Sequence, residues 1–566
     1  MVCLLRVRVF GVSIKSALEN FVMSIYTVSE NFIRKLPAFV FNKRCALESL
    51  RSNWGHEVQR ERNFEHISIY HRLRSDSGTE QFVDDNTWND LNMDSFFCQI
   101  DRNVSHIGSQ YLYHLLHEYA DDTILANRFS QYKHFSQRSD LRERILLQLR
   151  RLRHSGAHFI PSLIFQEGPV RPRAFVLIYV SSFLTLLSSV LIVSNAVFVF
   201  PTVGLFVINL IINHLYGRRV ASYFSDISNL SVMLDIGVSL SKIEDVEISQ
   251  LEELRELRDF SNALNRKIGW LTIDESRLNE LSRVVVSYLN YFCLFNLVAF
   301  VRSINSISNT QAKTRRVYEL VASLDAAISV SSYVENLRHY CYPQLNSRNL
   351  IAVENIYHPL LTNPVSNSIK ISDRSVLITG SNMAGKTTFM KTIGLNIILG
   401  QTIAICLASE ADIPRSAVRS SIKRTDDIND NKSYYFKEIE AVLEFMKLGA
   451  QKNSYIFLID EIFRGTNSLE RIAAATSVLK QLSRNNISLV TTHDVELHKL
   501  LANEFVMHHF SEQIEDGRHF FDYRIQDGPT KSRNAIRLLE LKGYPDHVVQ
   551  EAYLLAEKFV ESGSFY

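Results

Sequence analysis

The stretch Ile378–Gly394 of this chain has the sequence ITGSNMAGKTTFMKTIG. It begins inside a β-branched run, SVLIT at 375–379, and continues into an apolar run typical of a helix. Residues 380–387 follow the pattern G-x-x-x-x-G-K-T between that strand and that helix. Backbone N–H groups in such a loop, together with the start of the helix, surround phosphate oxygens. Because strand and helix patterns alternate around this loop, the sequence predicts an α/β phosphate-loop fold with a mostly parallel sheet.

The residue types in this loop match the chemistry of ATP and Mg²⁺. We expect Lys386 to reach the β- and γ-phosphates and the Thr387 hydroxyl to ligate Mg²⁺. The alternative, a glycine-rich turn without function, does not account for the order of strand, loop and helix. The residues expected to contact the nucleotide are Gly380, Ser381, Asn382, Met383, Ala384, Gly385, Lys386, Thr387 and Thr388.

A second apolar strand ends in two acids, in the segment SYIFLIDEIFRGTN at 454–467. Asp460 is placed to hold Mg²⁺, and Glu461 is placed to polarise the attacking water as a general base. The alternative is that this buried acidic pair has a structural role as a cap. Its position at the end of an apolar strand, downstream of the phosphate loop, favours catalysis.

A third strand pattern, ISLVTTHD at 487–494, carries His493 close to its end. A polar side chain at the tip of a neighbouring strand can contact the γ-phosphate or its attacking water. A single histidine is more often structural, but this position favours a catalytic sensor.

A long uncharged stretch lies far upstream of these motifs. No Asp, Glu, Lys or Arg occurs between Ala174 and Gly217, which is about twice the ~20 apolar residues of one membrane helix. With a break near Ser194–Asn195, the stretch predicts a transmembrane hairpin of helices at 174–193 and 196–215. The alternative is a pair of buried core helices, but soluble helices show a polar face.

Basic residues flank the uncharged stretch on both sides, which places both ends, and the phosphate-loop domain, in the cytoplasm. We therefore expect a multi-pass membrane protein with two spans, in contact with the lipid bilayer through 174–215. The flanking residues are Arg150, Arg151, Arg153, Arg171, Arg173, Arg218 and Arg219.

Two further segments allow more than one interpretation. The run VVVSYLNYFCLFNLVAFV at 284–301 is uncharged but short, so we expect a core helix. One extra span would also place the two chain ends on opposite sides of the membrane. The basic segment LRERILLQLRRLRHSG at 141–156 could contact DNA phosphates, contact anionic lipid or supply topological flanking charge.

Composition excludes several classes of protein. The net charge of +2 gives no overall attraction to nucleic acid, so any basic surface must be local. The six cysteines are scattered and contain no CxxC pair, which argues against a zinc site or a disulfide scaffold.

Four blocks of sequence resemble the ATPase domain of the MutS mismatch-repair family. They are TGSNMAGKTTFMK, DDINDNKSYYFKEIEAVLEFM, LIDEIFRGTNSLE and TTHDVEL. The tail from Tyr523 to Ala552 is similar to the family's C-terminal segment, and residues 84–113 resemble the start of its helical core. The resemblance implies three parts: an N-terminal helical region at 1–83, a helical core and lever domain at 84–345, and an ATPase domain at 346–566.

The resemblance also implies roles for residues outside the phosphate loop. Ser433 corresponds to a signature serine that reaches the partner's nucleotide across a dimer, and Glu438 falls on the acid of the same block. Tyr523 corresponds to an adenine-stacking aromatic residue. The family therefore implies a homodimer with composite ATP sites. The loop expected to cross its interface consists of Arg464, Gly465, Thr466 and Asn467.

These observations predict a membrane-anchored MutS-like ATPase that acts on DNA. The roughly 80 residues before the core match do not resemble the family's mismatch-reading domain with its Phe-x-Glu wedge. We therefore expect a repair or recombination structure as the substrate. In the family, lever helices end in a DNA clamp, and we expect the hairpin to replace or cap this clamp and to anchor the lever tips in a bilayer. The alternative is a membrane-bound mechanochemical switch that moves a protein or lipid partner without DNA.

Overall fold

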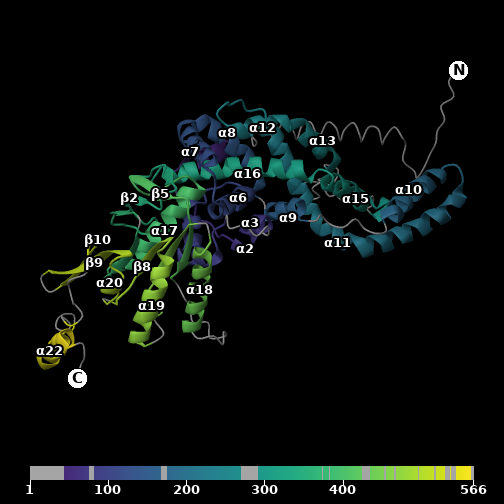
Figure 1. The fold of residues 1–566 in the computed structure, drawn as a ribbon. Helices are drawn as coiled ribbons and strands as arrows, with labels where there is room; N and C mark the ends of the chain where they lie inside the picture. The colour runs from purple at the N-terminus through teal and green to yellow at the C-terminus, as the bar shows by residue number, and fades with distance from the viewer. Residues whose placement is uncertain are drawn as a thin grey trace, which may run out of the picture.

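A mainly helical part precedes an α/β region in the computed structural model of the chain (Figure 1). The helical part fills the middle of the view, and α10 and α11 extend from it on the side opposite the α/β region. The structure describes residues 44–75, 82–153, 155–166, 175–268, 291–372, 374–381, 383–422, 434–451, 454–463, 467–494, 496–515, 518–529, 536, 539 and 543–562.

The helical part is built around α16, Gln311–Val334, whose last half is buried almost without interruption. The chain is also helical over residues 44–52. The other helices of this part are α2 Phe64–Ile67, α3 Ile69–Ser75, α4 Asp85–Asp90, α5 Met93–Ile100, α6 His106–His117, α7 Asp122–Gln137, α8 Ser139–Leu149, η1 Arg150–Leu152, η2 Ser155–Phe159, α9 Ile160–Phe165, α10 Phe175–Leu191, η3 Ala196–Phe198, α11 Val199–Leu240, α12 Ser249–Glu256, α13 Arg258–Ile268 and α15 Phe295–Ser308.

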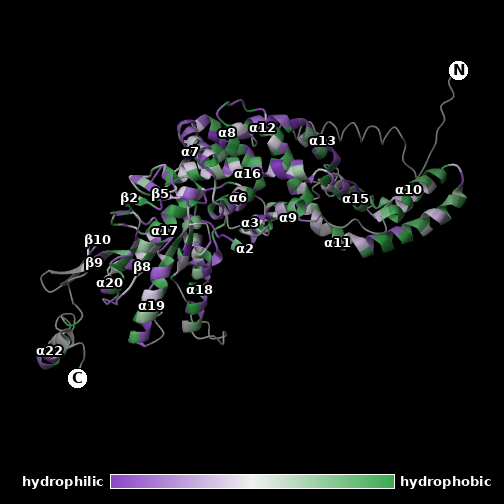
Figure 2. Cartoon of the chain, in the orientation of Figure 1, coloured by the Kyte–Doolittle hydropathy of each residue, from purple (hydrophilic) through white to green (hydrophobic). Residues whose placement is uncertain are grey.

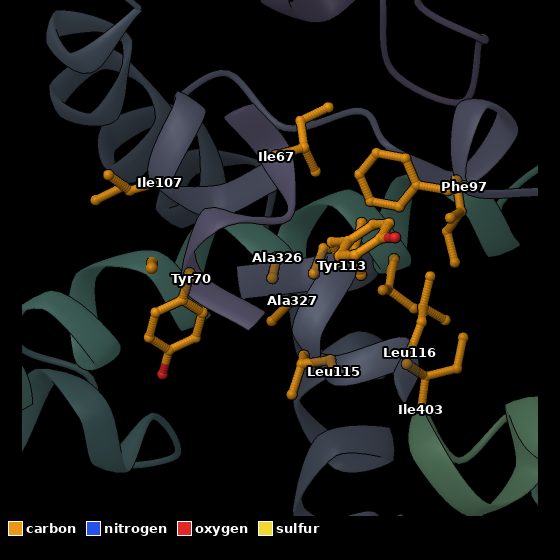
Figure 3. Close-up of a cluster of buried hydrophobic side chains, with 14 of the residues drawn as sticks. Ile67, Tyr70, Phe97, Ile107, Tyr113, Leu115, Leu116, Ala326, Ala327 and Ile403 are labelled. Atoms are coloured by element: carbon orange, nitrogen blue, oxygen red, sulfur yellow. The ribbon is translucent and has the colours of Figure 1, made fainter. Parts of the chain in front are cut away.

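A buried carboxylate joins α16 to the start of α6. Asp325 accepts hydrogen bonds from the backbone N–H groups of Val104 and Ser105, at 3.2 and 2.8 Å, and from the Ser105 hydroxyl. A Cβ on Gly108 would lie 2.4 Å from an Asp325 oxygen, so only glycine allows this approach. Figure 3 shows the adjoining apolar core, in which Ala326 and Ala327 of α16 lie near Tyr113 and Leu115 of α6.

The α/β region contains two sheets. The larger has the order β10-β9-β4-β8-β7-β6; all its pairings are parallel except the antiparallel β9–β10 pair. The mostly parallel sheet expected from the sequence is therefore present. The smaller sheet, β1-β5-β2-β3, is mixed and was not predicted. The strands are β1 Gln344–Asn346, β2 Ile351–Ile356, β3 Asn367–Ile371, β4 Ser375–Thr379, β5 Glu410–Pro414, β6 Ala417–Ser421, β7 Tyr455–Asp460, β8 Ile487–Thr491, β9 Phe505–Glu515 and β10 Arg518–Asp527.

Helices accompany these strands, and α18 and α19 lie side by side below the larger sheet in Figure 1. The helices of this region are α17 Lys386–Thr402, α18 Tyr434–Gly449, α19 Ser468–Leu482, α20 Glu496–Leu500 and α22 Asp546–Ser562. The chain passes from helix to strand between Val334 and Gln344, close to the domain boundary expected near 345–355.

The helical part packs directly against the α/β region through α4 and the edge strand β6. Asp90 accepts hydrogen bonds from the Ser420 hydroxyl at 2.7 Å and from the Ile422 N–H at 2.8 Å. Leu91 lies against Gly394 of α17, where a Cβ would be 3.3 Å from the leucine. One cluster of buried apolar residues therefore runs through both parts, and a second lies within the α/β region.

The arm consists of α10, η3 and the first half of α11, residues 175–217. The chain breaks between helices after Leu191, as the sequence predicts near Ser194–Asn195. However, α11 does not end at 215 but continues to Leu240, deep in the helical body. Pro201 is tolerated because it lies in the first turn of α11, where its missing N–H has no helical partner. Figure 2 shows that α10 and the first half of α11 are coloured mostly as hydrophobic.

Among the described residues, one helical stretch, Ala196–Gly217, is long and apolar enough to cross a membrane by length and composition alone. Helix α10 is also apolar, but its 17 residues make it shorter than the ~20 residues of a typical membrane-crossing helix. The described part of the run at 284–301 is helical, with a break at Leu294, and buries Leu297, Phe300 and Val301 of α15.

Candidate nucleotide-binding site

The glycine loop, residues 380–387, joins the fully buried strand β4 to helix α17. Gly380 has φ +131°, and a Cβ there would lie 2.6 Å from the Phe510 carbonyl oxygen. Gly385 has φ +101° and forms the N-cap of α17 without a side-chain cap. Both positions need glycine because L side chains rarely adopt this conformation. The loop thus leaves the first N–H groups of α17 without a side-chain cap, which suits an anionic ligand.

Lys386 is buried, and its ammonium group lies against the loop that precedes it. Its Nζ donates to the carbonyl oxygens of Gly380 at 2.5 Å and Ser381 at 2.9 Å, and lies 3.4 Å from His493 Nε2. A buried ammonium is costly unless polar groups surround it. This arrangement keeps a positive charge next to the loop, where phosphate oxygens are expected.

Thr387 and Asp460 meet across the sheet in the way that the sequence predicts. The Thr387 hydroxyl donates to Asp460 Oδ2 at 3.1 Å, and the other carboxylate oxygen accepts from the Thr491 hydroxyl. Strands β7 and β8 place Asp460 and Thr491 opposite each other in register. Thr491 therefore orients the Asp460 carboxylate, although the sequence analysis did not identify it.

Glu461 and His493 are also brought together. Glu461 Oε1 lies 3.0 Å from His493 Nε2, and the glutamate side chain is mostly buried. Glu461 has φ +55°, a left-handed conformation that costs a non-glycine residue free energy of order 1–3 kcal/mol. Its N–H donates to the Thr491 carbonyl at 3.0 Å, which fixes the turn at the end of β7. Two predicted residues, from the segments after β7 and β8, are thus in contact next to Lys386.

Glu438 supports the same turn from helix α18. This glutamate is 3% exposed, and its Oε1 accepts the Phe463 N–H at 2.5 Å. Phe463 also has a positive φ, +60°. The acid that the family resemblance singled out therefore holds the segment that follows Glu461.

Tyr523 lies beside the glycine loop although it comes from the distant strand β10. Its ring atom Cδ1 would be 3.3 Å from a Cβ on Gly385. The tyrosine occupies a bulge with φ +53°, where the register of β10 shifts. The Asn367 side chain holds this bulge by donating to the Tyr523 carbonyl at 3.0 Å and accepting the Ile525 N–H at 2.9 Å. No sequence motif points to Asn367, because its role depends on a contact between β3 and β10.

The other predicted residues have different outcomes. Ala384 is buried, Met383 is 74% exposed and Thr388 is exposed at the start of α17. Asn467 accepts the Leu469 N–H at 3.2 Å and caps α19. Asn382, Ser433, Arg464, Gly465 and Thr466 lie outside the described residues.

The residues of this site fit a Mg²⁺–nucleotide ligand. The hydroxyl of Thr387 and the carboxylate of Asp460 are hard oxygen ligands of the kind that Mg²⁺ prefers. Within the described ranges, no group of three His, Cys, Asp or Glu residues could form an all-protein metal site. Mg²⁺ typically keeps several waters and uses one or two protein ligands together with substrate phosphates. The Ser381 hydroxyl is buried and has no hydrogen-bond partner among the described residues, and so offers a further polar group at the loop.

Comparison with known proteins agrees with this geometry. Residues 376–560 match the family model of MutS domain V. The matched region begins inside β4 and includes the glycine loop, the two acids of β7, His493 and Tyr523.

Individual relatives show the same similarity. The chain is 30% identical over 247 residues to the DNA mismatch repair protein MutS of Thermus thermophilus, a match to 43% of this chain and 30% of that protein. It is 29% identical over 259 residues to MutS of Lactobacillus delbrueckii subsp. bulgaricus, covering 43% and 30%. It is 27% identical over 296 residues to MutS of Clostridium perfringens, covering 50% and 32%.

The similarity to these curated relatives therefore spans about 30% of their length. The comparisons support a relationship to the MutS family over the C-terminal part of the chain. The family model itself covers residues 376–560.

Proposed function

We propose that this protein binds and hydrolyses ATP with Mg²⁺, in a site built on the glycine loop. The observation that carries this proposal is the convergence of Lys386, the Thr387–Asp460 pair and the Glu461–His493 pair around one helix start. These residues come from β7, the segment after β8, and α17, so only the folded sheet brings them together.

Each residue has a role that follows from its position. Lys386 and the loop N–H groups stabilise the negative charge of the phosphates. Thr387 and Asp460 would hold Mg²⁺, which neutralises charge on the phosphate oxygens when bound. Glu461 orients the attacking water and accepts its proton, and His493 holds the Glu461 carboxylate in place. Tyr523 provides a ring against which the adenine can stack.

We propose further that the arm anchors the protein in a lipid bilayer. Its burial pattern is the reverse of that in a soluble helix pair. The side chains buried along α10 are mostly polar, namely Ser181, Ser182, Thr185 and Ser188 beside Ile178. Large apolar side chains are exposed: on α10 they are Val176, Leu177, Val180, Phe183, Leu184, Leu186, Leu187 and Val190, and on α11 Val199, Phe200, Val203, Val207, Ile208, Leu210, Ile211 and Leu215.

The buried polar residues of the arm satisfy one another. Asn209 accepts a hydrogen bond from the Ser181 hydroxyl at 2.5 Å and donates to Thr185 Oγ1 at 3.0 Å. The Thr202 hydroxyl donates to Ser188 Oγ at 3.0 Å. Small and hydroxyl-bearing residues at a helix interface, with apolar residues outside, are typical of helix packing in a membrane. Exposing these apolar side chains to water would instead create a large aggregation-prone surface.

The bilayer proposal predicts a multi-pass protein with its α/β region on the cytoplasmic side. The basic segment at 141–156 is then not a free DNA-binding surface, because part of its charge is used internally. Arg142 lies over the Trp54 ring at 3.8 Å, and Arg151 pairs with Asp235 at 2.6 Å.

The favoured function is a membrane-anchored, homodimeric ATPase that acts on DNA, because the relatives are DNA mismatch repair proteins. A second candidate is a membrane-bound switch that moves a protein or lipid partner. The arm favours this second candidate. The end of α11 farthest from the helical body exposes apolar side chains, which do not bind DNA phosphates.

The test is the ATPase rate of the detergent-solubilised protein with duplex, mismatched and branched DNA across a salt series. Action on DNA predicts stimulation by one DNA form, and the stimulation should weaken steeply as salt releases the phosphate contacts. A rate that is indifferent to every DNA would favour the switch. No ATPase activity above that of the Lys386→Ala variant would overturn the proposal as a whole.

A further inference from the structure

A third segment of the chain, residues 291–301, enters the arm between α10 and α11. It is helical over 291–293, breaks at Leu294 and continues as α15. Leu294 has φ +52°, so it ends one helix and starts the next. This break leaves carbonyl groups of the preceding turn without helical partners.

Polar residues of the arm bind two of these carbonyl groups. Asn209 Nδ2 of α11 donates to the Phe292 carbonyl at 2.6 Å. The Ser182 hydroxyl of α10 donates to the Cys293 carbonyl at 2.6 Å. Asn209 and Ser182 are both buried, and Asn209 simultaneously bonds Ser181 and Thr185. One asparagine therefore ties three segments together.

The break at Leu294 lies level with the middle of the apolar stretch Ala196–Gly217. The Phe292 ring is 5.7 Å from the Phe206 ring, and Phe206 lies about half-way along the 22 residues of Ala196–Gly217. At 1.5 Å per residue that stretch is about 33 Å long, which matches a hydrocarbon core of about 30 Å. Non-helical backbone at this depth needs polar partners inside the protein, which Asn209 and Ser182 supply.

The segment then returns toward the helical body. The Phe300 ring lies 5.8 Å from the Tyr223 ring, and Tyr223 is beyond Gly217 on α11. The charged Arg302 follows and is exposed. The preceding described helix, α13, ends at Ile268, which is buried in the helical body. The described residues nearest to the segment in sequence, Ile268 before it and Arg302 after it, therefore both lie toward the helical body.

We propose that residues 291–301 form a half-membrane segment, which reaches the bilayer midplane at Phe292 and leaves on the side from which the chain came. The sequence suggested a core helix for this run, and the buried face of α15 agrees with packing against protein. However, Tyr291 is 44% exposed, and the next residue, Phe292, contacts Phe206 inside the apolar stretch, where a bilayer would surround the arm. A half-membrane segment also keeps both ends of the chain on the same side of the bilayer. This inference rests on the proposed membrane anchor.

The test measures depth with nitroxide spin labels in proteoliposomes, on a background without native cysteines. The reporters are Tyr291→Cys on the third segment, Val207→Cys on α11 and the water control Val246→Cys, a position that is 98% exposed outside the arm. We expect the Tyr291 label to collide with oxygen rather than with a polar nickel complex. Its depth should lie within about one helical turn, ~5 Å, of the Val207 label.

The outcomes separate the two proposals. If the Val207 label lies in lipid and the Tyr291 label is as water-accessible as the Val246 label, the half-membrane segment is wrong and the anchor stands. If both labels are water-accessible, the anchor itself is wrong.

A pair of variants tests the polar junction. Asn209→Ala removes the hydrogen bond to the Phe292 carbonyl together with the bonds to Ser181 and Thr185, whereas Thr202→Ala removes bonds to Ser188 and Phe198 and none to the third segment. We expect Asn209→Ala to increase the population of a mobile Tyr291 label roughly threefold, in line with about 0.6 kcal/mol for such bonds in membranes. Thr202→Ala should leave that label unchanged. Equal effects of the two variants would overturn the role of Asn209 as the anchor of this segment.

Discussion

The α/β region and the arm bury polar residues in opposite ways. In the α/β region, β4, β7 and β8 are apolar and buried along their length, and polar residues gather where the strands end. In the arm, hydroxyl and amide groups fill the interior, and Val, Leu and Phe side chains cover the outside. The same physical rule, that buried polar groups must be paired, thus produces a reaction site in one region and a helix junction in the other. The difference shows which solvent each region is built to contact.

The helical body connects these regions without a flexible linker among the described residues. Helix α11 runs unbroken from the arm to Leu240, and α16 packs against both α11 and α6. Helix α6 in turn contacts α17, which begins with Lys386. The phosphate site and the arm are therefore joined by packed helices.

The largest expected effect is at the α/β region. Glu461→Gln keeps the shape of the side chain but removes its ability to accept a proton. We expect kcat for ATP hydrolysis to fall by about 10²–10⁴, with ATP binding retained. Single-turnover hydrolysis and nucleotide binding should be measured on the same preparation. Unchanged turnover would show that Glu461 is not the general base of this site.

The next effect tests the arm. Val207→Arg places a charge on the apolar outer face at mid-stretch, and its insertion should cost about 3 kcal/mol. We expect a large loss of protein from the carbonate-resistant membrane fraction. The matched control is Val246→Arg, because Val246 is exposed outside the arm. Equal membrane fractions for the two variants would mean that the arm faces water or a protein partner.

Sequence reasoning identified residues that lie together in the fold where they belong to short motifs along the chain. The loop at 380–387 and the acids at 460–461 lie within short motifs, and the sheet brings them together as expected. It did not reveal Thr491 or Asn367, because their contacts depend on strand register and on a bulge in another strand. The small β1-β5-β2-β3 sheet was missed because its strands are short and mostly lack an alternating pattern.

The end of helix α11 also depends on contacts that are distant in the sequence. The sequence placed a helix end at 215 because charged residues follow, but charge ends a membrane span without ending a helix. Gly217 alone does not stop α11, because the chain beyond it buries Ile227, Leu230 and Leu234 against the helical body. Tertiary packing therefore decided where the helix ends.

A smaller effect concerns the helical body between the two regions. His71, His114 and His117 form a buried ring cluster beside Trp88. Burial lowers the pKa of His71 to about 4 and that of His114 to about 3. Because these rings are protonated more readily when unfolded, stability should be full above pH ~6.5 and fall as the pH drops toward ~4.

We expect a loss of about 2 kcal/mol in the free energy of unfolding over this pH range, which urea titration of the detergent-solubilised protein would detect. The control is His71→Phe, which keeps an aromatic ring but cannot titrate. Its stability should depend less on pH than that of the natural protein. The same pH dependence in both would show that titratable groups other than His71 dominate.

The smallest expected effect is at the nucleotide site and concerns the ring of Tyr523, on which we expect adenine to stack. Tyr523 is 46% exposed, and Asn367 holds its bulge beside Gly385. If adenine stacks on this ring, Tyr523→Ala should weaken ATP binding by about 0.5–1.5 kcal/mol, with little change in kcat. Tyr523→Phe keeps the ring and should bind ATP normally. A loss in both variants would point to the hydroxyl group, whereas no loss in either would place the adenine elsewhere. Because the bulge is held by β3, Asn367→Ala should reproduce part of the Tyr523→Ala effect without touching the ring.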